Sequence, residues 1–120
     1  MVFGLGKPNI KKMEKNKDIE GLIKALKNKD MILRYDAAKA LGRVDNGRAL
    51  DPLIKNLSHE KVYVRESYVM ALGEIGGVQA IEPLIGALND KNKYVRKKSV
   101  FALGEIGDVR VLEPMINVLN

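Results

Sequence analysis

Apolar residues recur three and four positions apart along most of the chain, in short stretches that polar turns separate. In residues 79–88, for example, one stripe holds Ile81, Leu84, Ile85 and Leu88. This spacing matches one face of a helix, whereas a half-buried strand would alternate with a period of two. We therefore expect helices at about 18–28, 31–43, 48–57, 62–74, 79–88, 92–105 and 111–119.

This pattern repeats every 31 residues. Residues 62–76 and 93–107 are identical at 10 of 15 positions without a gap, and residues 32–44 follow the same frame more loosely. Further positions with this spacing are Arg34, Arg65 and Arg96, then Leu41-Gly42, Leu72-Gly73 and Leu103-Gly104, then Pro52, Pro83 and Pro114. A fixed period of this length is typical of stacked-repeat proteins.

Each repeat is predicted to form two helices. The repeated proline falls in the first turn of the first helix, where a missing backbone N–H leaves no helical bond unmade. Gly76 and Gly107 follow the second helix, as a left-handed C-terminal cap requires. The small residues Ala102 and Gly104 are expected to let neighbouring helices approach closely.

The expected repeat domain spans 18–120, with repeats at about 18–47, 48–78 and 79–109 and a half repeat at 110–120. Residues 1–17 do not fit the repeat, because Gly4, Gly6 and Pro8 interrupt a helix there. We expect an N-terminal cap; a basic tail is the alternative. The last helix, 111–119, has no partner helix after it, so we expect either self-association there or truncation from a longer array. The residues expected to form the cap are Val2, Phe3, Leu5, Ile10 and Met13.

The repeated motif resembles a known family. Its form is (V/L)-R-x-x-A-x-x-A-L-G-x-I-G followed by A-(I/L)-(E/D)-P-L-I-x-x-L, similar to the HEAT-like repeats of the phycobilisome-lyase type over residues 18–120. The first copy departs from it, with Gly21 in place of the proline. The resemblance implies an all-α, right-handed α-solenoid of armadillo type, with about three and a half two-helix repeats whose second helices line a concave surface. The resemblance implies that most such proteins are non-catalytic interaction scaffolds. A few members are enzymes, namely bilin lyases, deoxyhypusine hydroxylase and certain DNA glycosylases.

Composition limits the chemistry. The chain has no Cys, and its single His is His59, so thiolate sites are excluded. The resemblance implies that deoxyhypusine hydroxylases bind two irons through paired His-Glu motifs. This chain has one such dipeptide, His59-Glu60, and it lies in a turn. We therefore expect His59 to hydrogen-bond a helix end instead. We expect no catalytic residue, no cofactor and no metal. No segment is long and apolar enough to span a bilayer, so we expect a cytoplasmic protein that does not enter membranes.

The repeated arginine has two interpretations. A guanidinium group suits phosphate or carboxylate ligands. One arginine per repeat at the same scaffold position is explained more simply if it ties adjacent turns together, through acidic groups and helix C-terminal carbonyls. We therefore predict a structural role for Arg34, Arg65 and Arg96.

Positions that differ between the copies lie along one stripe of the second helix, away from the apolar core stripe. A face that is only solvated would carry Lys, Glu and Gln, but this one carries aromatic residues and Met, which are enriched in interface cores. Packing over neighbouring repeats is the alternative explanation. The predicted partner-binding residues are Ile32, Tyr35, Asp36, Lys39, Tyr63, Glu66, Ser67, Met70, Glu74, Tyr94, Lys97, Lys98 and Phe101.

Charge separates the classes of partner. The excess positive charge of the chain, formally +6, arises outside the stripe and its flanks, notably in residues 7–29. The stripe and its flanks carry five basic and four acidic residues, namely Lys39, Arg43, Lys93, Lys97 and Lys98 against Asp36, Glu66, Glu74 and Glu105. A groove for nucleic acid should be basic along its length. We therefore expect another protein or a peptide as the partner, anchored by Tyr63, Met70, Tyr94 and Phe101. A nucleic acid, or an accessory role beside a bilin-lyase-like or other enzyme, is the alternative.

Overall fold

The computed structural model describes residues 7–44, 47–107 and 112–119, except the side chains at positions 114, 115, 118 and 119. These residues form helices and turns, with no strand among them. The helices are α1 (Ile10–Lys15), α2 (Ile19–Ala25), α3 (Met31–Val44), α4 (Leu50–Lys55), α5 (Val62–Ile75), α6 (Ile81–Ala87), α7 (Lys93–Ile106) and α8 (Leu112–Leu119), with a 3-10 turn, η1 (Val78–Ala80), before α6. Within the same ranges, no helix has the length and apolar character needed to cross a membrane.

The seven helices that the pattern predicts are all present, as α2 to α8, with first helices a few residues shorter than expected. Helix α1 is an addition, because the expectation that residues 1–17 hold no helix is wrong. The interrupting residues Gly4, Gly6 and Pro8 all precede it, and the Asn9 side chain caps it by accepting a hydrogen bond from the Lys12 N–H at 3.0 Å.

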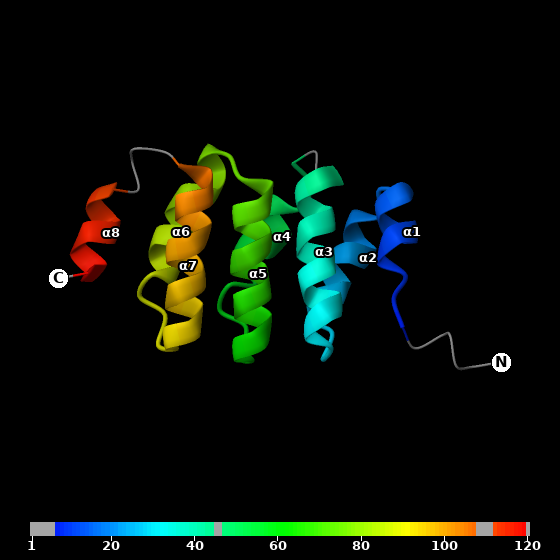
Figure 1. Ribbon diagram of the computed structural model, residues 1–120, viewed down its shortest axis with the longest axis horizontal. Coiled ribbons are helices and arrows are strands. Elements are labelled where there is room, and N and C mark those ends of the chain that lie inside the picture. The colour runs from blue at the N-terminus through cyan, green and yellow to red at the C-terminus, as the bar shows by residue number, and fades with distance from the viewer. Residues whose placement is uncertain (1–6, 45–46, 108–111, 120) are drawn as a thin grey trace.

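The long second helices α3, α5 and α7 lie side by side and parallel, and the short first helices form a row behind them (Figure 1). Each first helix packs on the second helix of its own repeat, α2 on α3, α4 on α5 and α6 on α7. Helix α1 packs against α2 and α3, at the N-terminal end of both rows. Its Ile10 is buried and Met13 packs on the core, whereas Val2, Phe3 and Leu5 lie outside the described residues.

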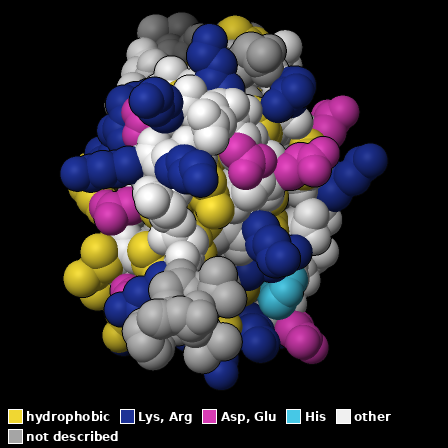
Figure 2. All heavy atoms as spheres, turned by 90° about the vertical axis from the view of Figure 1, so that its right-hand side faces the viewer, with side chains coloured by type: hydrophobic (Ala, Val, Ile, Leu, Met, Phe, Trp, Pro, Cys, Tyr) yellow, Lys and Arg dark blue, Asp and Glu magenta, His cyan; other side chains and the backbone are white. Residues whose placement is uncertain are grey.

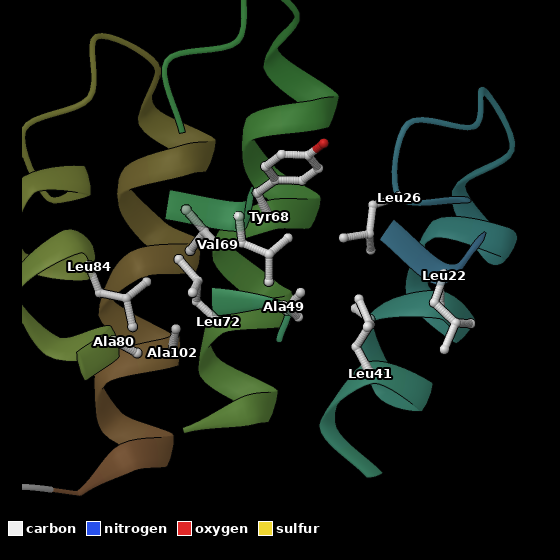
Figure 3. Close-up of a cluster of buried hydrophobic side chains, with 14 of the residues drawn as sticks. Leu22, Leu26, Leu41, Ala49, Tyr68, Val69, Leu72, Ala80, Leu84 and Ala102 are labelled. Carbon is white, nitrogen blue, oxygen red and sulfur yellow. The ribbon is translucent and has the colours of Figure 1, made fainter. Parts of the chain in front are cut away.

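The core fills the space between the two rows. Leu22, Leu41, Leu72 and Leu84 come from four different helices and are fully buried (Figure 3). Burying such apolar side chains provides the main driving force that holds successive repeats together. Tyr68 of α5 brings a phenol hydroxyl into this region, and its ring extends between the helices toward the α2 side.

The hydroxyl of Tyr68 is buried and has no hydrogen-bond partner among the described atoms. Burial also raises the pKa of this phenol. An unpaired buried hydroxyl costs stability, because the group loses its water without gaining a partner. Tyr68→Phe is therefore expected to raise the free energy of unfolding by about 1 kcal/mol in urea titrations. Tyr35→Phe removes an exposed hydroxyl and should change nothing; a loss of stability in Tyr68→Phe would show that the hydroxyl is satisfied.

The prediction that the repeated arginine ties adjacent turns together is confirmed for Arg65. Arg65 is 4% exposed, and its Nε and Nη2 bond the two oxygens of Asp90, at 2.9 and 3.2 Å. Its Nη1 donates to the carbonyl oxygens of His59 and Glu60 at 2.7 and 3.2 Å. The equivalent Arg34 and Arg96 donate in the same way to carbonyls of the turn that precedes their helix.

The turn before each second helix is closed by one side chain. Asp90 Oδ1 accepts a hydrogen bond from the Asn92 N–H at 2.9 Å, and one repeat earlier His59 Nδ1 accepts from the Lys61 N–H at 3.0 Å. Lys61 is the N-cap of α5, so the prediction that His59 bonds a helix end is confirmed. Asp90 and His59 occupy the same repeat position, but only Asp90 provides a carboxylate for the neighbouring arginine.

Two glycines set the distance between second helices. A Cβ on Gly42 would lie 2.8 Å from Glu74 Cβ, and a Cβ on Gly73 would lie 2.7 Å from Ala102 Cβ. The prediction that Gly104 allows this approach is wrong, because no described atom lies within 4 Å of the Cβ that it would carry.

Glycine ends α5 and α7. Gly107 has the left-handed conformation predicted for a cap, with φ 68° and ψ 19°, and its N–H bonds the Leu103 carbonyl. Gly76 also has a positive φ of 73°, but its ψ of −159° leads the chain away in an extended direction. Both conformations favour a residue without a Cβ.

Candidate functional site

A groove with a volume of about 450 Å³ lies across the outer face of α3, α5 and α7. Its lining comes from all three helices, so the stacking of the repeats creates it. The lining residues are Tyr35 and Lys39 of α3, Glu66, Met70 and Glu74 of α5, and Tyr94, Lys97, Lys98, Phe101, Ala102 and Glu105 of α7.

Aromatic side chains border the groove. Phe101 is 69% exposed, Tyr94 52% and Tyr35 48%, on helices whose backbones are fixed by the core. Lysine ammonium groups lie near two of these rings, with Lys39 Nζ 5.5 Å from the centre of Tyr35 and Lys93 Nζ 5.2 Å from that of Tyr94. The groove therefore exposes apolar rings with lysine ammonium groups at its border. Covering such a surface with a partner is more favourable than leaving it in water.

The close packing of α5 on α7 forms the groove floor. Ala102 is buried against Gly73, and a Cβ on Gly73 would also come within 3.2 Å of Glu105 Oε1. Larger residues at either position would fill the space between the helices. The repeat scaffold and the groove thus depend on the same small side chains.

Charged side chains in the groove form a network. Lys39 Nζ lies 2.8 Å from Glu74 Oε1, and this hydrogen bond is the main reason why the pKa of Lys39 is raised. Arg43, counted from the sequence among the groove charges, instead donates hydrogen bonds from its Nε and Nη2 to the carboxylate of Glu14 of α1, at 2.7 and 2.8 Å. This bond lowers the pKa of Glu14.

Nine of the thirteen predicted partner-binding residues line the groove. Ile32 and Asp36 are exposed on α3 but lie outside the lining. Two lining residues, Ala102 and Glu105, were not among the predicted ones. The nine are Tyr35, Lys39, Glu66, Met70, Glu74, Tyr94, Lys97, Lys98 and Phe101.

Two predicted residues, Ser67 and Tyr63, are less exposed than the sequence predicts. Ser67 is 2% exposed, with its Oγ 2.7 Å from the Leu26 carbonyl oxygen, because the C-terminal end of α2 reaches α5 at this point. Tyr63 is half-buried outside the groove, with the Arg34 guanidinium 4.5 Å from the centre of its ring. Tyr63 thus packs against the preceding repeat, as the alternative explanation proposes, and its role in partner binding stays a prediction.

The positive charge of the chain lies mainly outside the groove. Residues 7–29 contain eight lysines and three acidic residues. Lysine and arginine side chains spread over this N-terminal end of the molecule, with acidic side chains between them (Figure 2). The groove itself is balanced, with Lys39, Lys97 and Lys98 against Glu66, Glu74 and Glu105.

The described residues show no metal-binding geometry, since no three His, Asp or Glu side chains come close enough to share an ion. The fold and the groove define an all-helical repeat protein whose second helices carry an exposed surface. A family profile described as HEAT repeats matches residues 19–91 and 50–120. The chain therefore belongs to the HEAT repeat family. A comparison with curated proteins finds no match.

Proposed function

We propose that this protein is a non-catalytic scaffold that binds a segment of another protein in the groove across α3, α5 and α7. HEAT repeats commonly serve as interaction scaffolds, which supports this function. The observation that carries the proposal is the exposure of Phe101 and Tyr94 in a groove whose walls are rigid helices. Covering such rings contributes on the order of 1–2 kcal/mol each.

We further propose the finer architecture that the sequence suggests. The repeats, about three and a half of the phycobilisome-lyase type over 18–120, form a right-handed solenoid with the second helices on its concave side. Residues 1–17 cap its first repeat, a proposal that the packing of α1 on α2 and α3 supports. The exposed Leu112 and Ile116 of α8 support the proposal that the last helix takes part in self-association.

A nucleic acid is not the partner that the groove favours. A protein binds nucleic acid mainly through basic side chains that contact phosphates along the whole interface. In this groove three carboxylates lie among the three lysines. Retention on heparin that depended on Lys97 and Lys98, rather than on the lysines of residues 7–29, would contradict this assignment.

Selection of random 12-residue peptides displayed on phage tests the function even though the natural partner is unidentified. We expect the full chain to enrich peptides whose affinity falls at least tenfold, about 1.4 kcal/mol, in the variant Tyr94→Ala with Phe101→Ala. The fold should persist, because both side chains are exposed.

Ile32→Ala is the matched control, since Ile32 is 66% exposed on α3 but does not line the groove. Its peptide affinity should equal that of the wild type. Peptides that bind both variants as tightly as the wild type would place the binding site elsewhere. Failure to enrich any peptide would count against the function itself.

A further inference from the structure

We propose that the groove selects segments that carry a Lys or Arg side chain beside an apolar residue, with the cation bound between Glu74 and Glu105 and the apolar residue on Phe101. This inference rests on the proposed function and adds the chemistry of the partner. Charge complementarity in the last turns of α5 and α7 supports it.

Glu74 and Glu105 occupy the same repeat position, and each lies in the last turn of its helix. The C-terminal end of a helix carries a partial negative charge, so a cation is favoured there and a carboxylate is not. Neither α5 nor α7 has a basic residue in its last turn. Two carboxylates and two negative helix ends therefore meet at one end of the groove.

The chain's own cations satisfy this site only in part. Lys39 pairs with Glu74 at 2.8 Å. Arg43 is the next cation on α3, but its Nε and Nη2 bond Glu14, and its attraction to Glu74 is weaker than this bond. Glu105 is left facing Glu74 without a cation of its own among the described salt bridges.

The electrostatics of Glu105 agree with this geometry. Burial raises the pKa of its carboxyl, the negative charge of Glu74 raises it further, and the attraction of Lys39 offsets only part of the effect. A guanidinium or ammonium group from a partner would reverse this imbalance, and a guanidinium group could bond both carboxylates at once.

The opposite end of the groove has a net positive charge, from Lys97 and Lys98 against Glu66. Lys97 and Lys98 lie on α7 about 10 Å before Glu105 along the helix axis, given a rise of about 1.5 Å per residue. Phe101 lies between them and Glu105 in the sequence of the helix. A bound segment in extended form would cover this distance in about three residues. We therefore expect the order basic, apolar, acidic over neighbouring positions of the segment.

The peptides selected on the full chain provide the test. We expect enrichment of Lys or Arg next to an apolar residue. Replacing that basic residue with citrulline, which keeps the shape of arginine without its charge, should weaken binding at least tenfold. Glu105→Gln should lower the affinity for the arginine peptide by a similar factor and leave the affinity for the citrulline peptide unchanged. The thermal midpoint of this variant should equal or exceed that of the wild type.

Glu82→Gln is the matched control, because it removes the same charge from an exposed position on α6, outside the groove. It should change the affinity less than twofold. Groove-dependent peptides without a basic residue, or an equal loss in Glu82→Gln and Glu105→Gln, would overturn this inference and leave the proposed function standing. Peptides that bind independently of Tyr94 and Phe101 would overturn both.

Discussion

Replacing Arg65 with methionine is expected to lower the free energy of unfolding by about 3–5 kcal/mol. Methionine keeps much of the side-chain volume but removes the hydrogen bonds to the carboxylate of Asp90 and to the carbonyls of His59 and Glu60. The Asp90 side chain is only 12% exposed, so its charge would remain buried without a partner. Urea unfolding followed by circular dichroism would measure the change.

Arg34→Met is the matched control, because Arg34 binds the same kind of carbonyls but its neighbouring turn offers His59 where Asp90 would stand. Its loss should be about 1–2 kcal/mol, from ordinary hydrogen bonds and the contact of its guanidinium with the Tyr63 ring. Equal losses in the two variants would show that the salt bridge adds nothing to the carbonyl contacts.

Acid titration gives a second signature of the same contact. Burial tends to raise the pKa of Asp90, but the hydrogen bonds from Arg65 and the Asn92 N–H outweigh it, and the pKa lies below the ordinary 3.8. A lowered pKa contributes stability at neutral pH that is lost as the pH falls below that value. The difference between the wild type and Arg65→Met should therefore shrink below about pH 3.8.

Gly73→Val is expected to lower the free energy of unfolding by about 3 kcal/mol, at the upper end of the cost of overpacking. A Cβ at position 73 would lie 2.7 Å from Ala102 Cβ and 3.0 Å from Ala102 Cα, so α5 and α7 would have to separate. In an exposed helix the same change would be slightly favourable, because glycine has the lower helix propensity. Thermal and urea unfolding would both register the loss.

Gly104→Val is the control that the repeat itself provides. Gly104 stands at the position equivalent to Gly73 in a helix of the same length, but no described atom lies within 4 Å of its added Cβ. Its stability should stay within about 0.5 kcal/mol of the wild type. A large loss at both positions would show that the glycines matter for the helix itself rather than for the approach of its neighbour.

The sequence was sufficient to predict the scaffold. Helical spacing located α2 to α8, because in a repeat protein each apolar stripe has the same neighbours in every copy. The role of the arginines followed from the same reasoning, since a residue at a fixed scaffold position meets the same turn each time. The groove was predicted in outline, because the positions that differ between copies lie on its helices.

The errors arise where the neighbours of a repeat position change from copy to copy. Ser67 is covered by the end of α2, while the equivalent Asp36 and Lys98 are exposed. Arg43 is drawn away from the groove by Glu14 of α1, which belongs to no repeat. Tyr63 meets Arg34 of the preceding copy. Comparing equivalent positions assumes identical surroundings, so it cannot predict contacts that occur in one copy only.

The central claim is that the scaffold presents one binding surface, the groove of α3, α5 and α7. Its most direct test is a map of amide chemical-shift changes in the ¹⁵N-labelled full chain as the tightest selected peptide is added. We predict the largest changes on the second helices, around Tyr94, Phe101 and Glu105, with little change in α1 and α2. Changes concentrated in α1, α2 or α8, with the groove amides unmoved, would contradict the claim.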